Sequence, residues 1–230
     1  GNAVVEDGGI LPDDLGAWNE ALGDALKTCD VVVTTGGASV GRADFAKKAL
    51  EGASRSVVRF GRLHMKPGKP TTFATLDANS FSDDVEGEKR WAFALPGNPV
   101  SALTTASLLV VPCLKRLQGV ARSSCGPAEL PVTLASPVSL DAVRPEFHRV
   151  ALSLRGGDGN AEPYRVRQSG EIVAASTGVQ RSSRLLSMRG AHALACLPER
   201  GRARLVAPAD GASEDPRRSH RATGGRAYEI

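Results

Sequence analysis

Aromatic residues and paired cysteines are scarce in this 230-residue chain. Phenylalanine, tyrosine and tryptophan make up 4% of the sequence, and it contains no motif of a nucleic-acid-binding module. Because single-stranded nucleic acids bind largely by stacking on aromatic side chains, no nucleic-acid partner is expected. The four cysteines lie far apart, at Cys29, Cys113, Cys125 and Cys196. None belongs to a C-x-x-C pair, which argues against a zinc ribbon, a redox pair or a dense disulfide framework and favours a reducing, cytoplasmic location.

A long unbroken hydrophobic run is also missing. The most apolar stretch, Leu108–Leu114, is short and contains Pro112, and no signal peptide stands at the start. No membrane span is therefore expected. The chain begins at Gly1 without a methionine and enters directly on an apolar segment, so we expect an N-terminally incomplete piece of a longer protein.

Lysine is absent from the second half of the chain. Residues 1–120 carry 13 basic and 14 acidic side chains, a net charge of −1, and residues 121–230 carry 16 and 11, a net charge of +5. All 16 basic residues of the second half are arginines, whose planar fork of donors suits oxyanions. Binding of an anionic ligand would explain this preference for arginine. A GC-rich genome, which favours arginine codons, would explain it equally well. Hydrophobic residues at 41% and charged residues at 23% are typical of a globular protein with a core.

Residues 1–120 alternate helical and strand-like patterns, as parallel α/β units do. Apolar residues recur at helical spacing over 15–26, and residues 30–35 form a short β-branched run typical of a buried parallel strand. Further strands are predicted at 56–61, 71–75 and 91–95, with a helix at 44–50 and a mostly apolar, buried helix at 100–117. The sequence predicts an α/β domain.

The second half contains short strand-like runs separated by turn residues. The composition changes at 119–127, which we interpret as a linker. Strands are predicted at 131–138, 147–154, 164–166, 171–175, 193–197 and 203–207, with a helical turn at 182–188. This spacing predicts a small β-barrel or sandwich over 128–208. Small and charged residues without periodicity dominate the end of the chain, so we predict a disordered tail at 209–230.

Three turns carry the strongest chemical signals. In the first, Gly36-Gly37-Ala38-Ser39-Val40-Gly41 follows a buried strand and precedes a helix, where free N–H groups suit phosphate. An ordinary strand-to-helix turn would also explain its first two glycines. In the second, Lys66-Pro67-Gly68-Lys69-Pro70 holds two ammonium groups at a fixed spacing, although a solvated turn would also contain such residues.

The third turn, Leu95-Pro96-Gly97-Asn98-Pro99-Val100-Ser101, also leads from a strand into a helix, with Ser101 near its start. Turns at the carboxyl ends of strands meet in one crevice of an open α/β sheet, so we expect a shared anion pocket. Asp44 is a candidate for a divalent cation or a catalytic water, with helix capping as the alternative. The four histidines show no ligand spacing, and no G-x-S-x-G hydrolase motif is present.

Five segments together resemble the C-terminal part of the molybdopterin molybdenumtransferases, the molybdenum insertase family of bacterial MoeA and the gephyrin E domain. They are TTGGASVGRADF, HMKPGKPTTFATL, ALPGNPVSAL, RPEFHRV and STGVQRSSRLLSMRGAHAL, between about Val5 and about Ala207. The resemblance implies a three-layer molybdopterin-binding α/β domain with a mostly parallel sheet at 1–120, incomplete at its N-terminus, and a small all-β barrel domain at 128–208.

The resemblance also implies a reaction and its site residues. Adenylated molybdopterin and molybdate, with Mg²⁺ or another divalent cation, give molybdenum cofactor and AMP in a homodimer. The implied catalytic residues are Asp44, Lys66 and Lys69, with Asp44 also linked to the metal. The implied substrate-binding residues are Gly36, Gly37, Ser39, Gly41, Pro70, Gly97, Asn98, Ser101, Arg144 and Ser182.

Two departures from the family bear on this reading. Arg42 stands where the family usually has an acid, and the first strand of the family's α/β domain, with its Asp-Ser-Asn segment, is missing. Three competing functions stay open. A molybdopterin adenylyltransferase resembles the first half of the chain but lacks the RPEFHR and SSRLLSMR segments. The second is a gephyrin-like scaffold without turnover, and the third is a partial product that only binds pterin.

Overall fold

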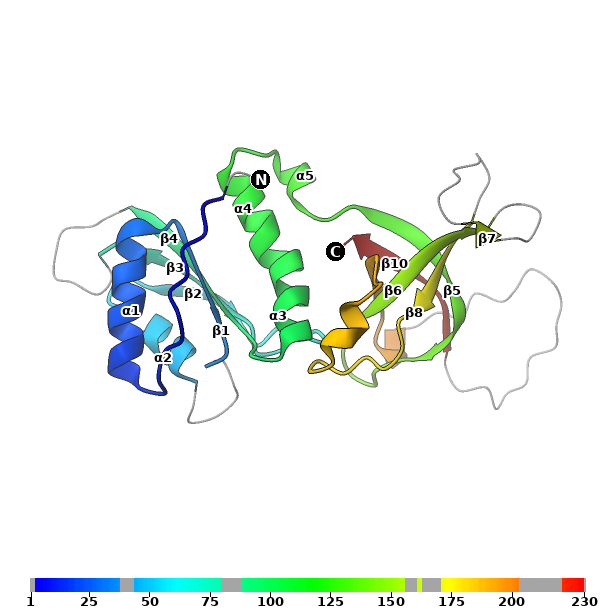
Figure 1. Ribbon diagram of the computed structural model, residues 1–230, viewed down its shortest axis with the longest axis horizontal. Coiled ribbons are helices and arrows are strands. Elements are labelled where there is room, and N and C mark those ends of the chain that lie inside the picture. The colour runs from blue at the N-terminus through cyan, green and yellow to red at the C-terminus, as the bar shows by residue number, and fades with distance from the viewer. Residues whose placement is uncertain are drawn as a thin grey trace. The chain divides into compact units, whose positions relative to one another are not determined.

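The computed structural model describes residues 3–37, 44–79, 88–155, 161–162, 171–202 and 221–229. The chain divides into two compact units (Figure 1). Unit 1 contains residues 1–63 and 68–126, and unit 2 contains residues 64–67 and 127–230. The segment 64–67 therefore belongs to unit 2, although both of its chain neighbours belong to unit 1.

Unit 1 is built on a mixed four-stranded sheet. Its elements are α1 (Leu15–Thr28), β1 (Val31–Thr35), α2 (Phe45–Gly52), β2 (Val57–Gly61), β3 (Thr72–Asp77), β4 (Lys89–Leu95), α3 (Pro99–Thr105), the π-helix η1 (Ala106–Val110), α4 (Val111–Leu117) and α5 (Arg122–Cys125). The strand order is β1-β4-β3-β2. The short helix α5 lies within the predicted linker.

The prediction of a mostly parallel sheet is wrong for the strands described. Only β1 and β4 pair in parallel, whereas β3 runs antiparallel to both β4 and β2. No helix lies between β2 and β3 among the described residues, and a parallel pairing needs a longer crossover connection, usually a helix. The apolar patterns predicted where the strands lie in the sequence, but they carry no information on whether neighbouring strands run parallel or antiparallel.

Helices cover both faces of this sheet, as the α/β prediction required (Figure 1). Alternate residues of β4 point to opposite faces. Ala92 and Ala94 pack against α1 and α2, which contribute a core cluster, whereas Phe93 and Leu95 pack against the helical run that begins at Pro99. The core of α1 and α2 consists of Trp18, Leu22, Leu26, Ala46, Ala49, Leu50 and Ala53.

The run Pro99–Leu117 forms three consecutive helical segments with a π-turn in the middle. Pro112 has no N–H to donate, and the N–H of Val111 reaches back to the carbonyl of Ala106, which is a π-type bond. The predicted burial is only partly correct, because Leu103 and Val111 are exposed. By length and composition this 19-residue run, with mean hydropathy 1.4, is also long and apolar enough to cross a membrane, which a search for an unbroken apolar stretch overlooks.

Unit 2 is a curled, half-barrel β-sheet with little helix. Its elements are β5 (Glu129–Ser139), β6 (Glu146–Arg155), β7 (Ala161–Glu162), β8 (Glu171–Ser176), the 3-10 helix η2 (Leu185–Met188), β9 (Ala193–Leu197), the 3-10 helix η3 (Arg200–Arg202) and β10 (Arg221–Glu229). The strand order is β7-β6-β8-β5-β10-β9, and β9 also pairs with β6. Val132, Leu134, Val150, Ala174 and Leu197 lie in its core.

The predicted strands at 131–138, 147–154, 171–175 and 193–197 are confirmed in β5, β6, β8 and β9. The predicted strands at 164–166 and 203–207 lie outside the described residues. The prediction of a disordered tail is wrong for residues 221–229, because β10 pairs antiparallel with both β5 and β9. Main-chain hydrogen bonds to these two neighbouring strands hold β10. Such bonds do not require alternating apolar side chains, so the sequence pattern did not predict this strand.

Candidate functional site

The turns that follow β1 and β4 meet at one edge of the sheet in unit 1. These strands run parallel, with Thr35 beside Leu95, so Gly36 and Gly97 begin neighbouring turns. The N–H of Gly36 donates to the carbonyl of Leu95 over 3.1 Å. A Cβ on Gly97 would lie 3.2 Å from the Cα of Gly36. The structure thus brings together two of the three turns predicted from the sequence.

Gly37 is required by packing. Its φ of +61° lies in the left-handed region, and an added Cβ would lie 2.8 Å from a ring carbon of Trp18. Its carbonyl accepts from the N–H of Ala46 in the first turn of α2. Gly36 also has a positive φ, of +83°. The backbone conformation and packing therefore explain why glycine occupies both positions, without any role for a ligand.

Asp44 caps helix α2. Its Oδ1 accepts from the main-chain N–H of Lys47 over 3.2 Å, the arrangement typical of an N-cap. Burial raises the pKa of Asp44 above its ordinary value, against the lowering influence of the Lys47 N–H. No group of three His, Cys, Asp or Glu residues able to hold a metal ion occurs within the described ranges. Ser39, Gly41 and Arg42 lie outside those ranges.

The turn after β4 leads into α3. Asn98 occupies the N-cap position without a side-chain capping bond, and Pro99 begins the helix. Gly97 and Asn98 are exposed, whereas Ser101 is buried, with 4% of its surface accessible. Of these predicted ligand-binding residues, Gly97 and Asn98 are the ones open to solvent.

Lys69 and Pro70 lie in a tight turn before β3. The N–H and the hydroxyl of Thr71 both donate to the carbonyl of Gly68, over 3.1 and 2.7 Å. Because β3 runs antiparallel to β4, with Thr72 beside Ala94, this turn lies at the same sheet edge as Gly36 and Gly97. Lys69 is exposed and has no hydrogen bond or ion pair with another described residue.

Lys66 differs from Lys69, because it is held in unit 2. Its main chain forms hydrogen bonds with the two residues that flank Glu146. The N–H of Lys66 donates to the carbonyl of Pro145, and its carbonyl accepts from the N–H of Phe147 over 2.7 Å. Its ammonium lies 2.9 Å from Glu146 Oε2 and 3.4 Å from Asp141 Oδ2. Burial acts to lower the pKa of Lys66, but the two carboxylates outweigh it and raise that pKa above its ordinary value.

Arg144 shares a carboxylate with Lys66. Its Nη2 lies 3.6 Å from Asp141 Oδ2, and its main-chain N–H donates to Asp141 Oδ1 over 3.0 Å, as does that of Val143. Burial acts to raise the pKa of Asp141, but these N–H groups and the Lys66 ammonium lower it to about 2. Two predicted anion-binding residues therefore contact the same oxygen of one ionised aspartate.

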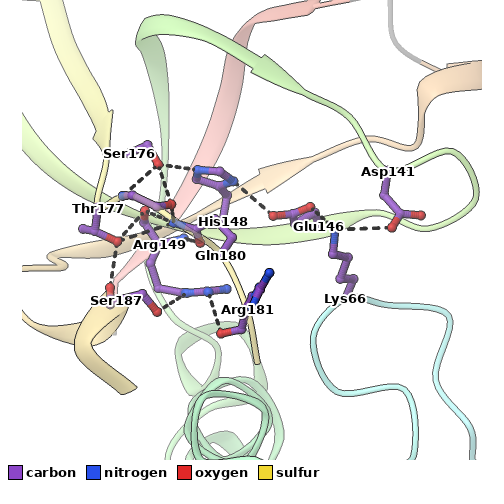
Figure 2. A network of polar contacts seen from close by, with 11 residues as sticks. Lys66, Asp141, Glu146, His148, Arg149, Ser176, Thr177, Gln180, Arg181 and Ser187 are labelled. Carbon is purple, nitrogen blue, oxygen red and sulfur yellow. Dashed lines mark hydrogen bonds and ion pairs between the residues drawn. The ribbon is translucent and has the colours of Figure 1, made fainter. Parts of the chain in front are cut away.

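A polar network that the sequence analysis missed extends along β6 (Figure 2). Glu146 Oε1 lies 3.1 Å from His148 Nδ1, and His148 Nε2 lies 2.8 Å from the hydroxyl of Ser176. The side chains of Glu146 and His148 are 6% and 9% exposed. The signal was available, because two polar residues at alternate strand positions lie on the same face.

Arg149 is fully buried and ties the loop after β8 to β6. Its Nε donates to the hydroxyl of Ser187 over 3.2 Å, and its Nη2 donates to the carbonyl of Arg181 over 3.4 Å. Its carbonyl accepts from Gln180 and Thr177. Burial lowers the pKa of this guanidinium.

Ser182, predicted from the family resemblance, belongs to the loop that these bonds hold, and it is half-buried. Its neighbour Arg181 provides the carbonyl that Arg149 binds (Figure 2). The loop's position therefore depends on a residue that the sequence analysis did not select.

Residues 2–116 match the family model described as a probable molybdopterin binding domain. The chain belongs to this MoeA/gephyrin-like family. It is 38% identical over 201 residues to gephyrin of Dictyostelium discoideum, covering 84% of this chain and 26% of that protein. It is 36% identical over 200 residues to the molybdenum cofactor synthesis protein cinnamon of Drosophila melanogaster, covering 87% and 29%.

A bacterial relative matches a shorter part. The molybdopterin molybdenumtransferase of Haemophilus influenzae is 43% identical over 115 residues, which cover half of this chain and 25% of that protein. The crystal structure of a MoeA molybdopterin biosynthesis protein from Pyrococcus horikosii superposes with a TM-score of 0.59 at 21% identity, covering 96% of this chain and 42% of that one. The chain thus spans less than half the length of these relatives, and the structural likeness concerns the fold alone.

Proposed function

We propose that this chain acts in the molybdenum insertase step of molybdenum cofactor biosynthesis, in which adenylated molybdopterin and molybdate give molybdenum cofactor and AMP. The observation that carries the proposal is the sheet edge of unit 1, where the turns of Gly36 and Gly97 meet and the turn of Lys69 lies beside them. Family membership and the names of the relatives support molybdopterin as the class of ligand.

The edge has the chemistry of a phosphate site. At the start of α2 the N–H groups of Ala46 and Lys47 already donate to Gly37 and Asp44. The turn of Gly97 leads into α3, where the first helix N–H groups lack partners within the helix. Lys69 adds an exposed ammonium that no described carboxylate neutralises. In the proposed function Lys69 and these N–H groups hold the phosphates of the adenylated pterin, and Pro70 fixes the turn that carries the lysine.

Asp44 fits a role as one ligand of Mg²⁺. This cation commonly takes one or two protein carboxylates and fills its remaining positions with phosphate oxygens and water. The Oδ1 of Asp44 caps α2, and no hydrogen bond or ion pair with another described residue engages its Oδ2. When bound, the cation would neutralise charge on the phosphoanhydride as it breaks.

Unit 2 supplies groups suited to molybdate, a tetrahedral dianion. Lys66 and Arg144 both contact Asp141 Oδ2, and Ser182 lies on the loop that Arg149 holds. Ammonium, guanidinium and hydroxyl donors suit such an oxyanion.

The proposed assembly is a cytoplasmic homodimer of the longer protein. Leu103, Val111 and Leu117 of the helical run are 44%, 43% and 40% exposed, which supports coverage of this apolar face by a second copy. The four cysteines form no disulfide bond with one another, which supports a reducing compartment. Light scattering of the longer protein should give twice the mass of one chain, and a monomer at micromolar concentration would contradict this assembly.

The reaction is tested by AMP release from adenylated molybdopterin in magnesium buffer, with and without molybdate. The assay uses this chain. Molybdate-dependent release supports the insertase. Conversion of molybdopterin and ATP into the adenylated pterin would replace it with the adenylyltransferase, and the absence of molybdate-dependent release would overturn the proposal.

A further inference from the structure

Two positive and two negative side chains form a cluster of linked ion pairs in unit 2. Lys66 Nζ lies 2.9 Å from Glu146 Oε2 and 3.4 Å from Asp141 Oδ2, and Arg144 Nη2 lies 3.6 Å from Asp141 Oδ2. The formal charges of these four groups cancel. The two cations proposed to hold a dianion are therefore already balanced by two carboxylates before the ligand arrives.

The positive groups of this cluster are the more accessible ones. The side chains of Lys66 and Arg144 are 36% and 31% exposed, whereas those of Asp141 and Glu146 are 17% and 6% exposed. An anion can reach the cations from solvent, but the carboxylates remain behind them. Like charges at close range repel strongly where solvent is partly excluded.

Asp141 is fixed in this position by its own turn. Its Oδ1 accepts from the N–H groups of Val143 and Arg144, both over 3.0 Å, which leaves Oδ2 directed at the two cations. Both bonds hold the carboxylate in place whatever the cations do. The aspartate therefore cannot withdraw easily when an anion approaches.

We propose that Asp141 is an internal counter-ion that determines how weakly the Lys66 and Arg144 pair binds tetrahedral oxyanions. This inference rests on the oxyanion-binding role of these residues in the proposed function. An oxyanion bound here is attracted by the two cations and repelled by Asp141. Glu146 adds to the repulsion. Only a ligand with further contacts outside the cluster then binds tightly, so abundant simple oxyanions do not fill the site.

The test is isothermal titration of the chain with sodium molybdate and, separately, with sodium sulfate. Asp141→Asn keeps an oxygen that can accept the two N–H groups and removes the charge. We expect both anions to bind the variant at least ten-fold more tightly than they bind the unaltered chain. The loss of repulsion should outweigh the added freedom of the two cationic side chains. Combining Asp141→Asn with Arg144→Gln should abolish the gain.

The matched control is Glu171→Gln. It removes the same charge from unit 2, from a carboxylate 3.4 Å from Arg155 in an exposed ion pair. This variant should bind both anions as the unaltered chain does. An equal gain in both variants would indicate a general effect of net charge and would overturn the assignment to Asp141.

Unchanged or weaker anion binding by folded Asp141→Asn would also overturn the inference, because Asp141 would then only orient the cations. If that variant fails to fold by circular dichroism, Asp141→Ser supplies a shorter acceptor for the turn and should show the same gain. The outcome is independent of turnover. Tighter anion binding by the variant, with no molybdate-dependent AMP release by the unaltered chain, would retain the inference and reject the insertase. Release by the unaltered chain without tighter binding by the variant would reject only the inference.

Discussion

The ring of Trp18 fills the space beside the Cα of Gly37. Two of its ring carbons lie 2.8 and 2.9 Å from where a Cβ on that glycine would stand. A helix of one face of the sheet thus packs directly against the turn that begins the candidate phosphate site. The packing couples the shape of that turn to the core of unit 1.

Gly37→Ala should destabilise unit 1 through both strain and overlap. A left-handed φ and an overpacked contact together should lower the free energy of unfolding by about 2–4 kcal/mol, measured by urea denaturation. Gly52→Ala is the control, because Gly52 ends α2, is exposed and has nothing within 4 Å of a Cβ. The control should change stability by less than about 1 kcal/mol. Equal stability of the two variants would contradict this explanation of Gly37.

Substitutions of Asp44 can separate its capping role from its proposed cation role. Serine also caps helices, so Asp44→Ser should keep stability within about 0.5 kcal/mol, whereas Asp44→Ala should lose about 1 kcal/mol. Both variants lack the carboxylate, and both should lose magnesium-dependent AMP release. If Asp44→Ser retains full turnover across a magnesium titration, the cation role is wrong and capping is sufficient.

The two lysines of the Lys66 to Pro70 turn should respond differently to substitution. Lys69→Ala should leave stability within about 0.5 kcal/mol and reduce turnover, because its ammonium is exposed and makes no described contact. Lys66→Ala should lower the free energy of unfolding by about 1–3 kcal/mol, between the values typical of exposed and buried ion pairs, since Glu146 would lose its nearest cation. Urea denaturation and AMP release, measured on both variants, check this. A destabilised Lys69→Ala would show that this lysine is structural.

Acid should weaken unit 2 through Asp141. The pKa of this group is about 2 in the folded chain and 3.8 ordinarily, so its contribution is complete above about pH 4 and is lost as the pH falls through 2. Glu146, whose pKa is also lowered despite burial, acts in the same direction.

Urea denaturation of the unaltered chain and Asp141→Asn at several pH values measures the contribution of Asp141. The stability difference should be up to about 2 kcal/mol at pH 7 and should approach zero near pH 2. The raised pKa of Lys66 does not interfere, because its contribution is complete below its ordinary value of 10.5. A difference that is constant from pH 7 to pH 2 would contradict the cited shift.

Arg149 should be replaceable by an apolar residue but not by a small one. Arg149→Ala removes a fully buried side chain that holds Ser187 and Arg181, and should cost about 3–5 kcal/mol. Arg149→Met fills most of the space without burying a charge and should cost less than half as much. Thermal or urea unfolding checks both. A methionine variant as unstable as the alanine variant would show that the hydrogen bonds, and not the volume, stabilise the loop.

Local patterns predicted most of the fold from the sequence. The β-branched run at Val31–Thr35 and the apolar period of α1 are properties of adjacent residues, and both elements are confirmed. The predicted burial of the strand is wrong, because β1 lies at the end of the strand order in the described sheet and its residues are half-buried or exposed. The direction of β3 and the strand β10 were missed, because each depends on pairing with distant segments. Within the site, the glycine turns were identified, but Asp141 and Glu146 were not. Their importance arises only when Lys66 folds back beside β6.

The path of residues 64–67 determines how the chain can be divided. This segment leaves unit 1, adds its main chain to that of Glu146 and then returns. Expression of residues 127–230 alone would therefore omit the partner of Pro145 and Phe147 and the cation nearest Glu146. We therefore expect residues 127–230 to fold only when a peptide containing residues 64–67 is added. Cutting the chain between 126 and 127 would then give two fragments that depend on each other, and not two independent domains.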